Sequence, residues 1–324
     1  MAQPAQFQAR FEENALKLRP VPPILPVILP PIRPPILPLI RPPIRPATLP
    51  PILYAILVRL LRFLALIGGL AVLGLYACQR QIEYQPGHAN PAPESLGLTG
   101  VQVETLQTPD HERLILWYAA PKPGQPTVLF FHGNAGDIAD RAPRLAFYQS
   151  KGLGAAFLSY RGFGGSTGQI SEPGLITDAR TAYDWLRTTT PAAKIVLVGE
   201  SLGTGVAVQL AAQLAPQTPV AAVALDAPYA STLAIAQARF PYLPVAWLMQ
   251  DQFLSINHIA AIHAPLMIQH GTADMVVPYT SGQTLFAAAV EPKTFTPLPG
   301  RGHEIIFAPD TWQREVDFFA RTIR

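Results

Sequence analysis

A serine inside a Gly-Glu-Ser-Leu-Gly pentapeptide is the residue of this sequence best suited to chemistry. Ser201 comes shortly after an apolar run at 195–199 and precedes a helical pattern at 204–214. A serine flanked by glycines where a strand turns into a helix lies on a tight turn that exposes its hydroxyl. The helix that begins there helps to stabilise negative charge. The pattern predicts a nucleophile, with a structural loop serine as the alternative.

A nucleophilic serine needs a base, and the best-placed histidine is His303. It lies in LPGRGHEII, residues 298–306, where two glycines predict a flexible loop between the last strand and a C-terminal helix. His132 and His270 each precede a glycine at a strand end, which favours a role in shaping loops. The other histidines have no comparable context. We therefore expect His303 to take the serine proton.

The base in turn needs an acid to orient it, and Asp274 is the first candidate. It lies in QHGTADMVVP, residues 269–278, shortly after an apolar strand pattern. Asp226 ends the preceding strand pattern and is the alternative acid. With Asp274, the chain order is nucleophile, acid and base, as expected when the serine occupies a strand–turn–helix elbow.

An anionic intermediate on this serine would need two hydrogen-bond donors. The backbone N–H of Leu202, which follows the nucleophile, is one candidate. The N–H of Asn134, in the His-Gly-Asn-Ala-Gly stretch at 132–136, is the other, although this stretch could also be a simple glycine-rich turn. The sequence contains no dinucleotide fingerprint, P-loop or HExxH pattern, so we expect no cofactor and no metal.

The elements that must position these residues alternate along the second part of the chain. Strand patterns occupy residues 101–107, 114–119, 127–131, 155–160, 195–199, 221–225, 266–270 and 294–297. Helical patterns lie at 176–189, 204–214 and 279–289. Two early strands followed by strand–helix alternation predict a mostly parallel eight-stranded sheet with helices on both faces. Reactive groups should then gather at the carboxyl ends of the strands.

The first part of the 324-residue chain has a different composition. Apolar residues make up 49% of the whole and charged residues only 14%, which excludes a disordered or highly charged protein. Residues 1–62 hold eight Lys/Arg against two Asp/Glu, whereas the rest of the chain is acidic overall. The net charge of +3 therefore comes from a basic N-terminal arm. It does not indicate a folded domain that binds nucleic acid, which would need basic residues clustered on its surface. The single cysteine excludes a disulfide framework.

Residues 1–51 are expected to be a Pro-rich, disordered arm. Proline opens every tetrad from Pro22 to Pro50, which breaks helices and favours extended polyproline-like structure. The repeat could be a PxxP ligand, a spacer or a low-complexity tract without selected function.

Residues 52–78 are predicted to be a membrane anchor. The run at 60–78 contains one charge, Arg62, and would span about 28 Å as a helix, close to the hydrocarbon thickness of a bilayer. A buried core helix is the alternative. Arg59 and Arg62 lie at the N-terminal end of the apolar run and only Arg80 follows it closely, so the N-terminus is expected in the cytoplasm and the domain outside it.

Two segments around the expected domain, residues 100–324, complete the organisation. Residues 79–99 are polar and rich in Pro and Gly, which is typical of a linker. The segment 229–262, between two predicted strands, is short and apolar, and its side chains either form an acyl-chain wall or pack as ordinary core.

Taken together, the motifs resemble those of the α/β-hydrolase superfamily from about residue 100 onward. HGNAG, then YRGFGGSTG at 160–168, GESLG, HGTAD with VVP, and GRGHE occur in the order of that family. The set is similar to membrane-anchored serine hydrolases with a short lid, whose relatives include protein depalmitoylases and lysophospholipases, and to the serine aminopeptidase-like group. The resemblance implies an α/β-hydrolase fold and a Ser201–Asp274–His303 triad.

The sequence thus predicts a single-pass membrane serine hydrolase that cleaves carboxylic esters or thioesters through an acyl-enzyme. Its expected partners are a small-molecule or lipid ester and the membrane, with no nucleic acid. The triad alone does not choose between leaving groups, so an amidase or peptidase is the alternative enzyme. A catalytically silent, membrane-tethered binding protein is the alternative outside enzymes.

Overall fold

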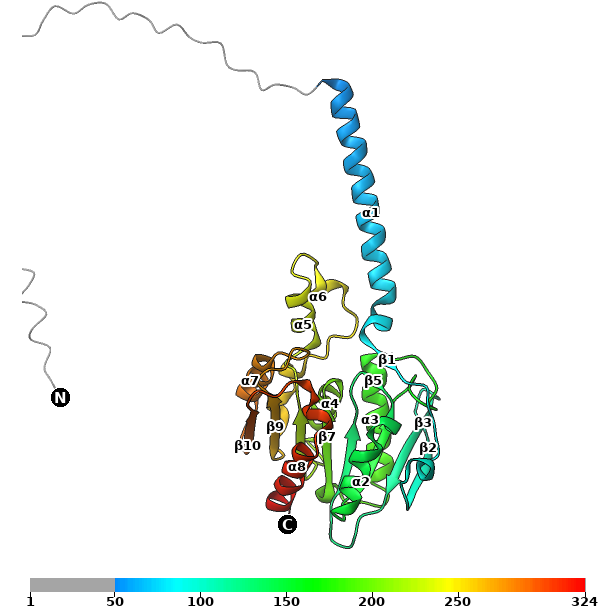
Figure 1. The fold of residues 1–324 in the computed structure, drawn as a ribbon, viewed down its shortest axis with the longest axis vertical. Coiled ribbons are helices and arrows are strands. Elements are labelled where there is room, and N and C mark those ends of the chain that lie inside the picture. The colour runs from blue at the N-terminus through cyan, green and yellow to red at the C-terminus, as the bar shows by residue number, and fades with distance from the viewer. Residues whose placement is uncertain (1–49, 324) are drawn as a thin grey trace, which may run out of the picture. The chain divides into compact units, whose positions relative to one another are not determined.

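A computed structural model describes residues 50–323 of the chain (Figure 1). The proline tetrads before Pro50, and with them almost all of the arm predicted at 1–51, lie outside the described residues. The helices are α1 (Pro51–Glu83), α2 (Ala142–Ser150), α3 (Glu172–Leu186), α4 (Leu202–Leu214), α5 (Thr232–Arg239), α6 (Val245–Leu248), α7 (Tyr279–Ala288) and α8 (Pro309–Thr322).

An eight-stranded sheet organises the domain, as the sequence predicts. Its strands are β2 (Val101–Gln107), β3 (Arg113–Ala119), β4 (Thr127–Phe131), β6 (Gly154–Ser159), β7 (Ile195–Glu200), β8 (Ala222–Asp226), β9 (Leu266–Gly271) and β10 (Lys293–Leu298). Their order is β10-β9-β8-β7-β4-β6-β3-β2. Only the pairs β2–β3 and β3–β6 are antiparallel, and the other neighbours are parallel. Strands β4 and β7 are wholly buried and mainly apolar, which is typical of parallel strands covered on both faces.

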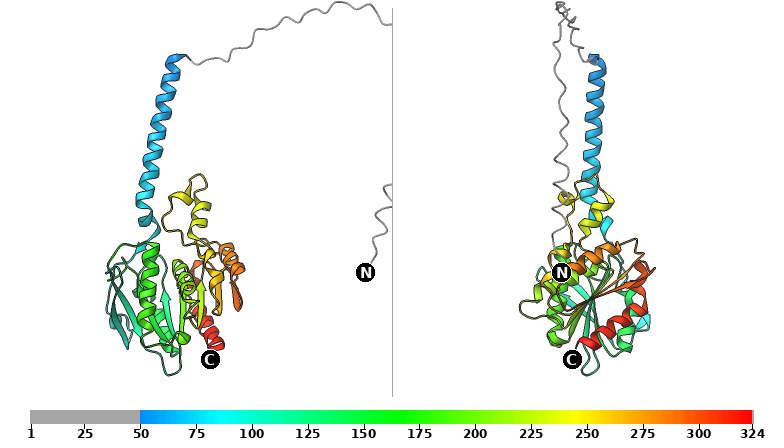
Figure 2. Two further views of the ribbon diagram at one scale, coloured as in Figure 1. Left: turned by 180° about the vertical axis from the view of Figure 1, so that it is seen from behind. Right: turned by 90° about the vertical axis from the view of Figure 1, so that its left-hand side faces the viewer.

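Helices cover both faces of this sheet and bury one apolar layer on each side (Figure 2). Residues of α3, α4 and α7 share one core with the strands, including Leu175, Val206 and Leu285. Residues of α2 and α8 share the other, including Tyr148 and Trp312. Because these strands are parallel, their carboxyl ends lie along the same side of the sheet. The loops that follow β4, β7, β9 and β10 are brought together there.

Helix α1 contains the segment predicted to be an anchor. It has 33 residues and a window of mean hydropathy 2.3, and none of that window is buried. Its length and composition are sufficient to cross a membrane. The alternative of a buried core helix is wrong, because the structure buries no residue of α1 against the protein.

The segment predicted to be a linker, residues 79–99, is instead packed against the domain. Residues 79–83 continue α1, and Tyr84 is buried. The short strand β1 (Gln85–Pro86) pairs in parallel with β5 (Ala135–Gly136) to form a separate two-stranded sheet. Backbone pairing of so few residues leaves no hydrophobic period in the sequence, so composition alone indicated a loop.

The lid between β8 and β9 contains α5 and α6, two short helices that follow Tyr229. Helix α5 has no buried residue, and Val245 is the buried side chain of α6. Phe240, Tyr242 and Trp247 are exposed. The alternative that lid side chains pack as ordinary core is therefore wrong for these three aromatic residues.

Candidate active site

Ser201 occupies a strained turn between β7 and α4. Its backbone has φ 49° and ψ −118°, a conformation that a residue with a side chain rarely adopts. The turn is crowded, because a Cβ on Gly199 would lie 2.5 Å from the carbonyl oxygen of Gly203. A Cβ on Gly203 would come within 2.1 Å of the carbonyl oxygen of Phe131. Both glycines of the pentapeptide are therefore sterically required.

The structure brings Ser201, His303 and Asp274 together. His303 begins the 3₁₀-helix η6 (His303–Phe307), and its Nε2 lies 3.0 Å from Ser201 Oγ. Its Nδ1 lies 2.8 Å from Asp274 Oδ2. Because an ionised carboxylate can only accept, Nδ1 carries the proton and Nε2 is left to accept the serine O–H. This is the arrangement in which a histidine acts as a general base.

The β9–α7 loop holds the Asp274 carboxylate by several donors. Its Oδ1 accepts the backbone N–H groups of Val276 and Val277, at 2.8 and 2.9 Å. Burial would raise the pKa of Asp274, but hydrogen bonds from His270 and His303 outweigh burial and hold that pKa well below its usual range. Asp274 is therefore ionised at neutral pH and can stabilise a positive charge on the imidazole of His303.

Among the described residues, the side-chain hydrogen bonds of His303 go to Asp274 and Ser201, and not to the alternative acid or the other strand-end histidines. Asp226 accepts Arg144 Nη2 at 2.7 Å and is fully buried. His132 hydrogen-bonds the carbonyl oxygen of Gly133 through Nδ1. Burial, together with the nearby guanidinium of Arg141, lowers the pKa of His132 to about 3, so its ring is neutral. His132 thus occupies the loop after β4 without reaching the serine.

The two expected oxyanion donors flank the elbow. Leu202 is the first residue of α4, where an N–H has no partner within the helix. Asn134 follows β4 and lines a cleft of about 300 Å³. The cleft is lined by Gly133, Asn134, Ala135, Gly136, Asp140, Arg141, Ser201, His303, Ile306 and Phe307. Among residues 50–323, the structure gives the backbone N–H of Asn134 no acceptor, so this donor is free to face a substrate oxygen.

The chain just after α1 fixes the loop that carries Asn134. Asn134 Nδ2 donates to the carbonyl oxygen of Glu83 at 2.8 Å, and the N–H of Gln85 donates to the carbonyl oxygen of Asn134 at 2.9 Å. The N–H of Gly87 donates to the carbonyl oxygen of Gly136 at 2.7 Å. Asp137 Oδ2 accepts the N–H that follows at residue 89. Sequence reasoning missed this role of the supposed linker.

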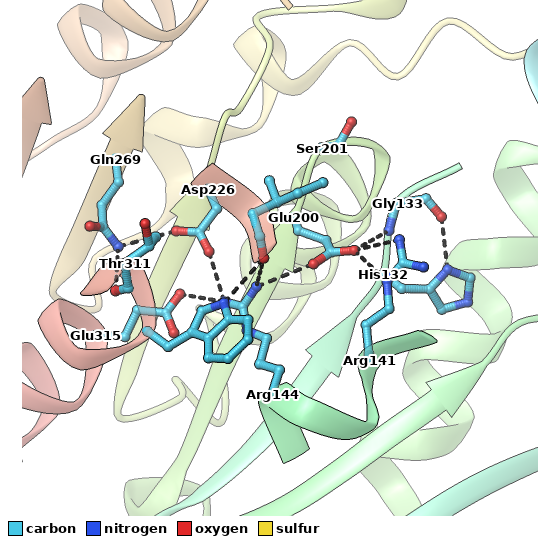
Figure 3. A network of polar contacts seen from close by, with 12 residues as sticks. His132, Gly133, Arg141, Arg144, Glu200, Ser201, Asp226, Gln269, Thr311 and Glu315 are labelled. Carbon is cyan, nitrogen blue, oxygen red and sulfur yellow. Dashed lines mark hydrogen bonds and ion pairs between the residues drawn. The ribbon is translucent and has the colours of Figure 1, made fainter. Parts of the chain in front are cut away.

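A buried polar network lies beneath the elbow (Figure 3). Glu200 is fully buried, and its Oε1 accepts Arg141 Nε at 2.8 Å and the N–H of Gly133 at 3.2 Å. Its Oε2 accepts Arg144 Nη1 at 3.2 Å. The acid beside Ser201 thereby ties the elbow to the loop that carries Gly133 and Asn134. Its position next to Ser201 was visible in the sequence, but its partners were not.

Arg144 connects this network to the turn of the base. Its Nη1 donates to the carbonyl oxygen of Ile306 in η6 at 3.3 Å, and its Nη2 donates to Asp226 and to Glu315 Oε1, the latter at 2.6 Å. Figure 3 shows the guanidinium between the carboxylates of Glu200, Asp226 and Glu315. One side chain of α2 therefore contacts the elbow, the strand beside it, the histidine turn and α8.

The charges of the network balance if one carboxyl keeps its proton. Burial raises the pKa of Glu315 despite the attraction of Arg144, and Asp226 raises it further. With Glu315 neutral, two guanidinium groups, Arg141 and Arg144, face two carboxylates, Glu200 and Asp226. Such a paired, hydrogen-bonded set is the form in which charges are tolerated in a core.

Among residues 50–323, no group of three or more His, Cys, Asp and Glu side chains is arranged to hold a metal ion.

The sequence matches known proteins over most of the domain. Residues 126–260 match the family described as alpha/beta hydrolase fold. The uncharacterized protein Rv2307c of Mycobacterium tuberculosis is 38% identical over 244 residues, which cover 74% of this chain and 85% of that protein. The lysophosphatidylserine lipase ABHD12 of Danio rerio is 30% identical over 210 residues, covering 60% of this chain and 54% of that protein.

Solved structures share the fold at lower identity. The Pyrococcus furiosus esterase Pf2001 superposes with a TM-score of 0.59 at 20% identity, covering 75% of this chain and 99% of that one. Est1E from Butyrivibrio proteoclasticus, with ferulic acid bound, superposes with a TM-score of 0.58 at 17% identity, covering 68% of this chain and 99% of that one. Both likenesses concern the arrangement of the sheet and its helices.

Proposed function

Because the chain belongs to the α/β-hydrolase family, we propose that it is a membrane-anchored serine hydrolase that cleaves carboxylic esters or thioesters through an acyl-enzyme. The observation that carries the proposal is the hydrogen-bonded series from Asp274 through His303 to Ser201, at 2.8 and 3.0 Å. The family and its lipase and esterase relatives support hydrolase activity in general. The residues that perform it and the ester substrate are our proposal.

In the first half of the reaction, Ser201 Oγ attacks the carbonyl carbon while His303 Nε2 takes the serine proton. The imidazolium that forms is stabilised by the ionised Asp274 on its other nitrogen. The carbonyl oxygen becomes an oxyanion and accepts the N–H groups of Leu202 and Asn134. Collapse of this intermediate breaks the bond to the leaving alcohol or thiol, which receives its proton from His303.

In the second half, water replaces the leaving group. His303 removes a proton from the water, which attacks the acyl carbon, and the same two amides hold the second oxyanion. Breaking the bond to Ser201 Oγ releases the acid, and His303 returns the proton to the serine. Proton transfer of this kind contributes typically ~10²–10⁴-fold, and one oxyanion donor contributes ~10²–10³-fold.

The substrate class is inferred from the cleft and from one relative. Ile306 and Phe307 give the cleft apolar wall beside Ser201 and His303. The zebrafish relative is named a lysophosphatidylserine lipase, and that similarity supports an ester-linked acyl chain as the group cleaved here. The apolar helix α1 would keep such an enzyme at the membrane where acyl esters gather.

The anchor also sets an orientation. Arg59 and Arg62 stand on the N-terminal side of the apolar run, so the positive-inside rule places that end in the cytoplasm and the domain outside. Protease added to intact spheroplasts of a bacterial expression host should digest the domain without lysis. Protection of the domain until the inner membrane is broken would reverse this orientation.

A fluorophosphonate probe tests the nucleophile. The full chain in detergent should be labelled, and Ser201→Ala should lose labelling and ester hydrolysis while its thermal melt stays near that of the wild type. A panel of acyl esters, thioesters and amides of rising chain length then distinguishes esterase from amidase. Turnover retained by Ser201→Ala would refute the proposed mechanism, and a wild-type chain that takes no label would favour a binding protein.

A further inference from the structure

The lid carries three exposed aromatic side chains, two of which the described protein leaves almost uncovered. Tyr242 is 97% exposed, Trp247 is 89% exposed and Phe240 is 46% exposed. We use "lid tip" for these three side chains. They lie within eight residues of one another, whereas single exposed apolar side chains are normal on any protein surface. Water is an unfavourable solvent for three exposed aromatic side chains so close in the sequence, so the lid tip calls for a partner.

Hydrogen bonds place the lid beside the end of the apolar helix. Gln79 Nε2 donates to the carbonyl oxygen of Leu248 at 3.0 Å, and the N–H of Gln250 donates to Gln79 Oε1 at 2.8 Å. Arg80 forms a two-bond ion pair with Asp251, at 2.8 and 3.1 Å. Asp251 is buried, so this contact is a fixed part of the fold.

The position of these hydrogen bonds along α1 indicates the depth at which the lid would lie relative to a bilayer. Gln79 and Arg80 are the first polar residues after the apolar run that ends at Cys78. They therefore mark the boundary between hydrocarbon and headgroups if α1 spans the membrane. Trp247 directly precedes Leu248, whose carbonyl oxygen is bonded to Gln79, so it lies close to this boundary. Trp and Tyr, the residue types of the lid tip, are enriched at this depth in membrane proteins.

The charge of the lid suits the same partner. Residues 230–250 contain one basic residue, Arg239, and no acidic residue. No carboxylate is thus available to be repelled by anionic headgroups, and the long side chain of Arg239 can remain at the polar surface. An aromatic and weakly basic face is the composition expected of an interfacial contact.

We propose that the lid tip inserts into the headgroup layer of the leaflet in which α1 ends, and that the partner of this surface is lipid. This inference rests on the proposed anchoring by α1. The lid leaves the carboxyl edge of the sheet after β8, next to the elbow, since Tyr229 OH donates to the carbonyl oxygen of Leu202 at 2.9 Å. Contact of the lid with lipid would therefore hold the edge that carries Ser201 toward the membrane surface.

Site-directed fluorescence tests the contact in the full chain. Cys78→Ala removes the only cysteine, and single cysteines at Tyr242 or Trp247 are then labelled with an environment-sensitive nitrobenzoxadiazole dye. In phosphatidylcholine vesicles, both probes should shift to the blue, and nitroxide-labelled phosphatidylcholine should quench them. Gln217→Cys is the matched control, because this exposed residue precedes β8 at the opposite edge of the sheet and should show neither effect.

A labelled cysteine at Leu70, in the middle of the apolar run, tests the anchoring by α1 separately from the insertion of the lid tip. Quenching at Leu70 without quenching at the lid tip would overturn the lid contact and leave the anchor intact. No quenching at Leu70 would refute the proposed anchoring, and with it this inference. A blue shift at Trp247 that grows with protein density but is not quenched by lipid would assign the surface to a second copy of the chain and also overturn the proposal.

Kinetics supply an independent readout. The double variant Tyr242→Ala, Trp247→Ala should lower kcat/KM for a long-chain ester embedded in vesicles by roughly tenfold, because interfacial burial of two aromatic side chains is lost. Hydrolysis of a short soluble ester should be unchanged. Val103→Ala, which shortens an exposed apolar side chain on edge strand β2, should change neither rate. Equal losses on both substrates would indicate a structural role for the lid tip and refute membrane contact.

Discussion

Gly87→Ala is a small change outside the catalytic residues that should slow the reaction. The N–H of Gly87 pairs with Gly136 in the loop that carries the proposed oxyanion donor Asn134. A Cβ added at Gly87 would lie 2.8 Å from the backbone carbon of Gly136 and 2.6 Å from Asp137 Oδ2, whereas ordinary contact begins at 3.4 Å. The backbone of the loop would have to move by the difference between 3.4 and 2.8 Å, about 0.6 Å.

This displacement sets the expected magnitude. Asn134 lies two residues before Gly136 in the same tight loop, so its N–H moves with it. A misplacement of about 1 Å at a reacting centre can cost ~10²-fold, and complete loss of one oxyanion donor costs ~10²–10³-fold. We expect Gly87→Ala to lower kcat roughly tenfold with little change in KM, because the loss falls on the transition state.

The assay is steady-state ester hydrolysis by the full chain in detergent, normalised to the fraction labelled by a fluorophosphonate. Gln85→Ala is the matched control, since it removes an exposed side chain and keeps the N–H that donates to Asn134. Gly74→Ala controls for the glycine substitution itself, because its added Cβ would meet nothing within 4 Å. Wild-type kcat in Gly87→Ala, or an equal loss in Gln85→Ala, would refute the reasoning.

Three further perturbations address the acid, the network and the buried histidine. Asp274→Asn should lower kcat by on the order of 10⁴. A larger loss of kcat in Asp226→Asn would show that Asp274 is not the acid that orients His303. Arg144→Met should lower the free energy of unfolding by ~3–5 kcal/mol, because buried carboxylates lose their partner. Arg180→Met, which breaks an exposed ion pair, should lower it by less than ~1 kcal/mol. Denaturant titration in detergent measures both free energies. The pKa of His132 is lowered to about 3 in the folded protein, whereas an unfolded histidine titrates at pH ~6.5. Between these pH values the unfolded state binds one more proton than the folded state. The free energy of unfolding should therefore fall as the pH drops from ~6.5 toward 3, by up to ~1.4 kcal/mol per pH unit. His132→Gln should flatten that decline in melts at pH 7, 6 and 5, and an unchanged slope would contradict the assignment.

The sheet could be predicted because its strands depend on local pattern. Buried parallel strands such as β4 and β7 need continuous apolar runs, and the glycines and prolines between them mark the turns. All eight predicted strands are present, with ends that differ by no more than one residue at either side. The elbow was equally visible, since the crowding around Gly199 and Gly203 leaves glycine as the tolerated residue and so writes the turn into the sequence.

The polar framework could not be predicted, because its partners are distant in the chain. Arg144 lies in a short helix and contacts Glu315, 171 positions away, and nothing local distinguishes it from a solvated arginine. Residues 79–99 were expected to be a linker because β1 has two residues and carries no hydrophobic period. In both cases the interaction depends on tertiary placement, which neither residue type nor spacing encodes.

The network beneath the elbow suggests why the protein keeps charges in its core. A buried ion pair adds little net stability compared with apolar side chains of similar size. Its hydrogen bonds are directional, however, and here they join three segments that catalysis would need in fixed register. Glu200 holds the N–H of Gly133 in the loop that carries the proposed oxyanion donor, and Arg144 holds the carbonyl oxygen of Ile306 in the turn that begins with His303. An apolar core could fill the same space but would not specify these relative positions. We therefore propose that Glu200 positions the elbow, since its carboxylate accepts hydrogen bonds from Gly133, Arg141 and Arg144.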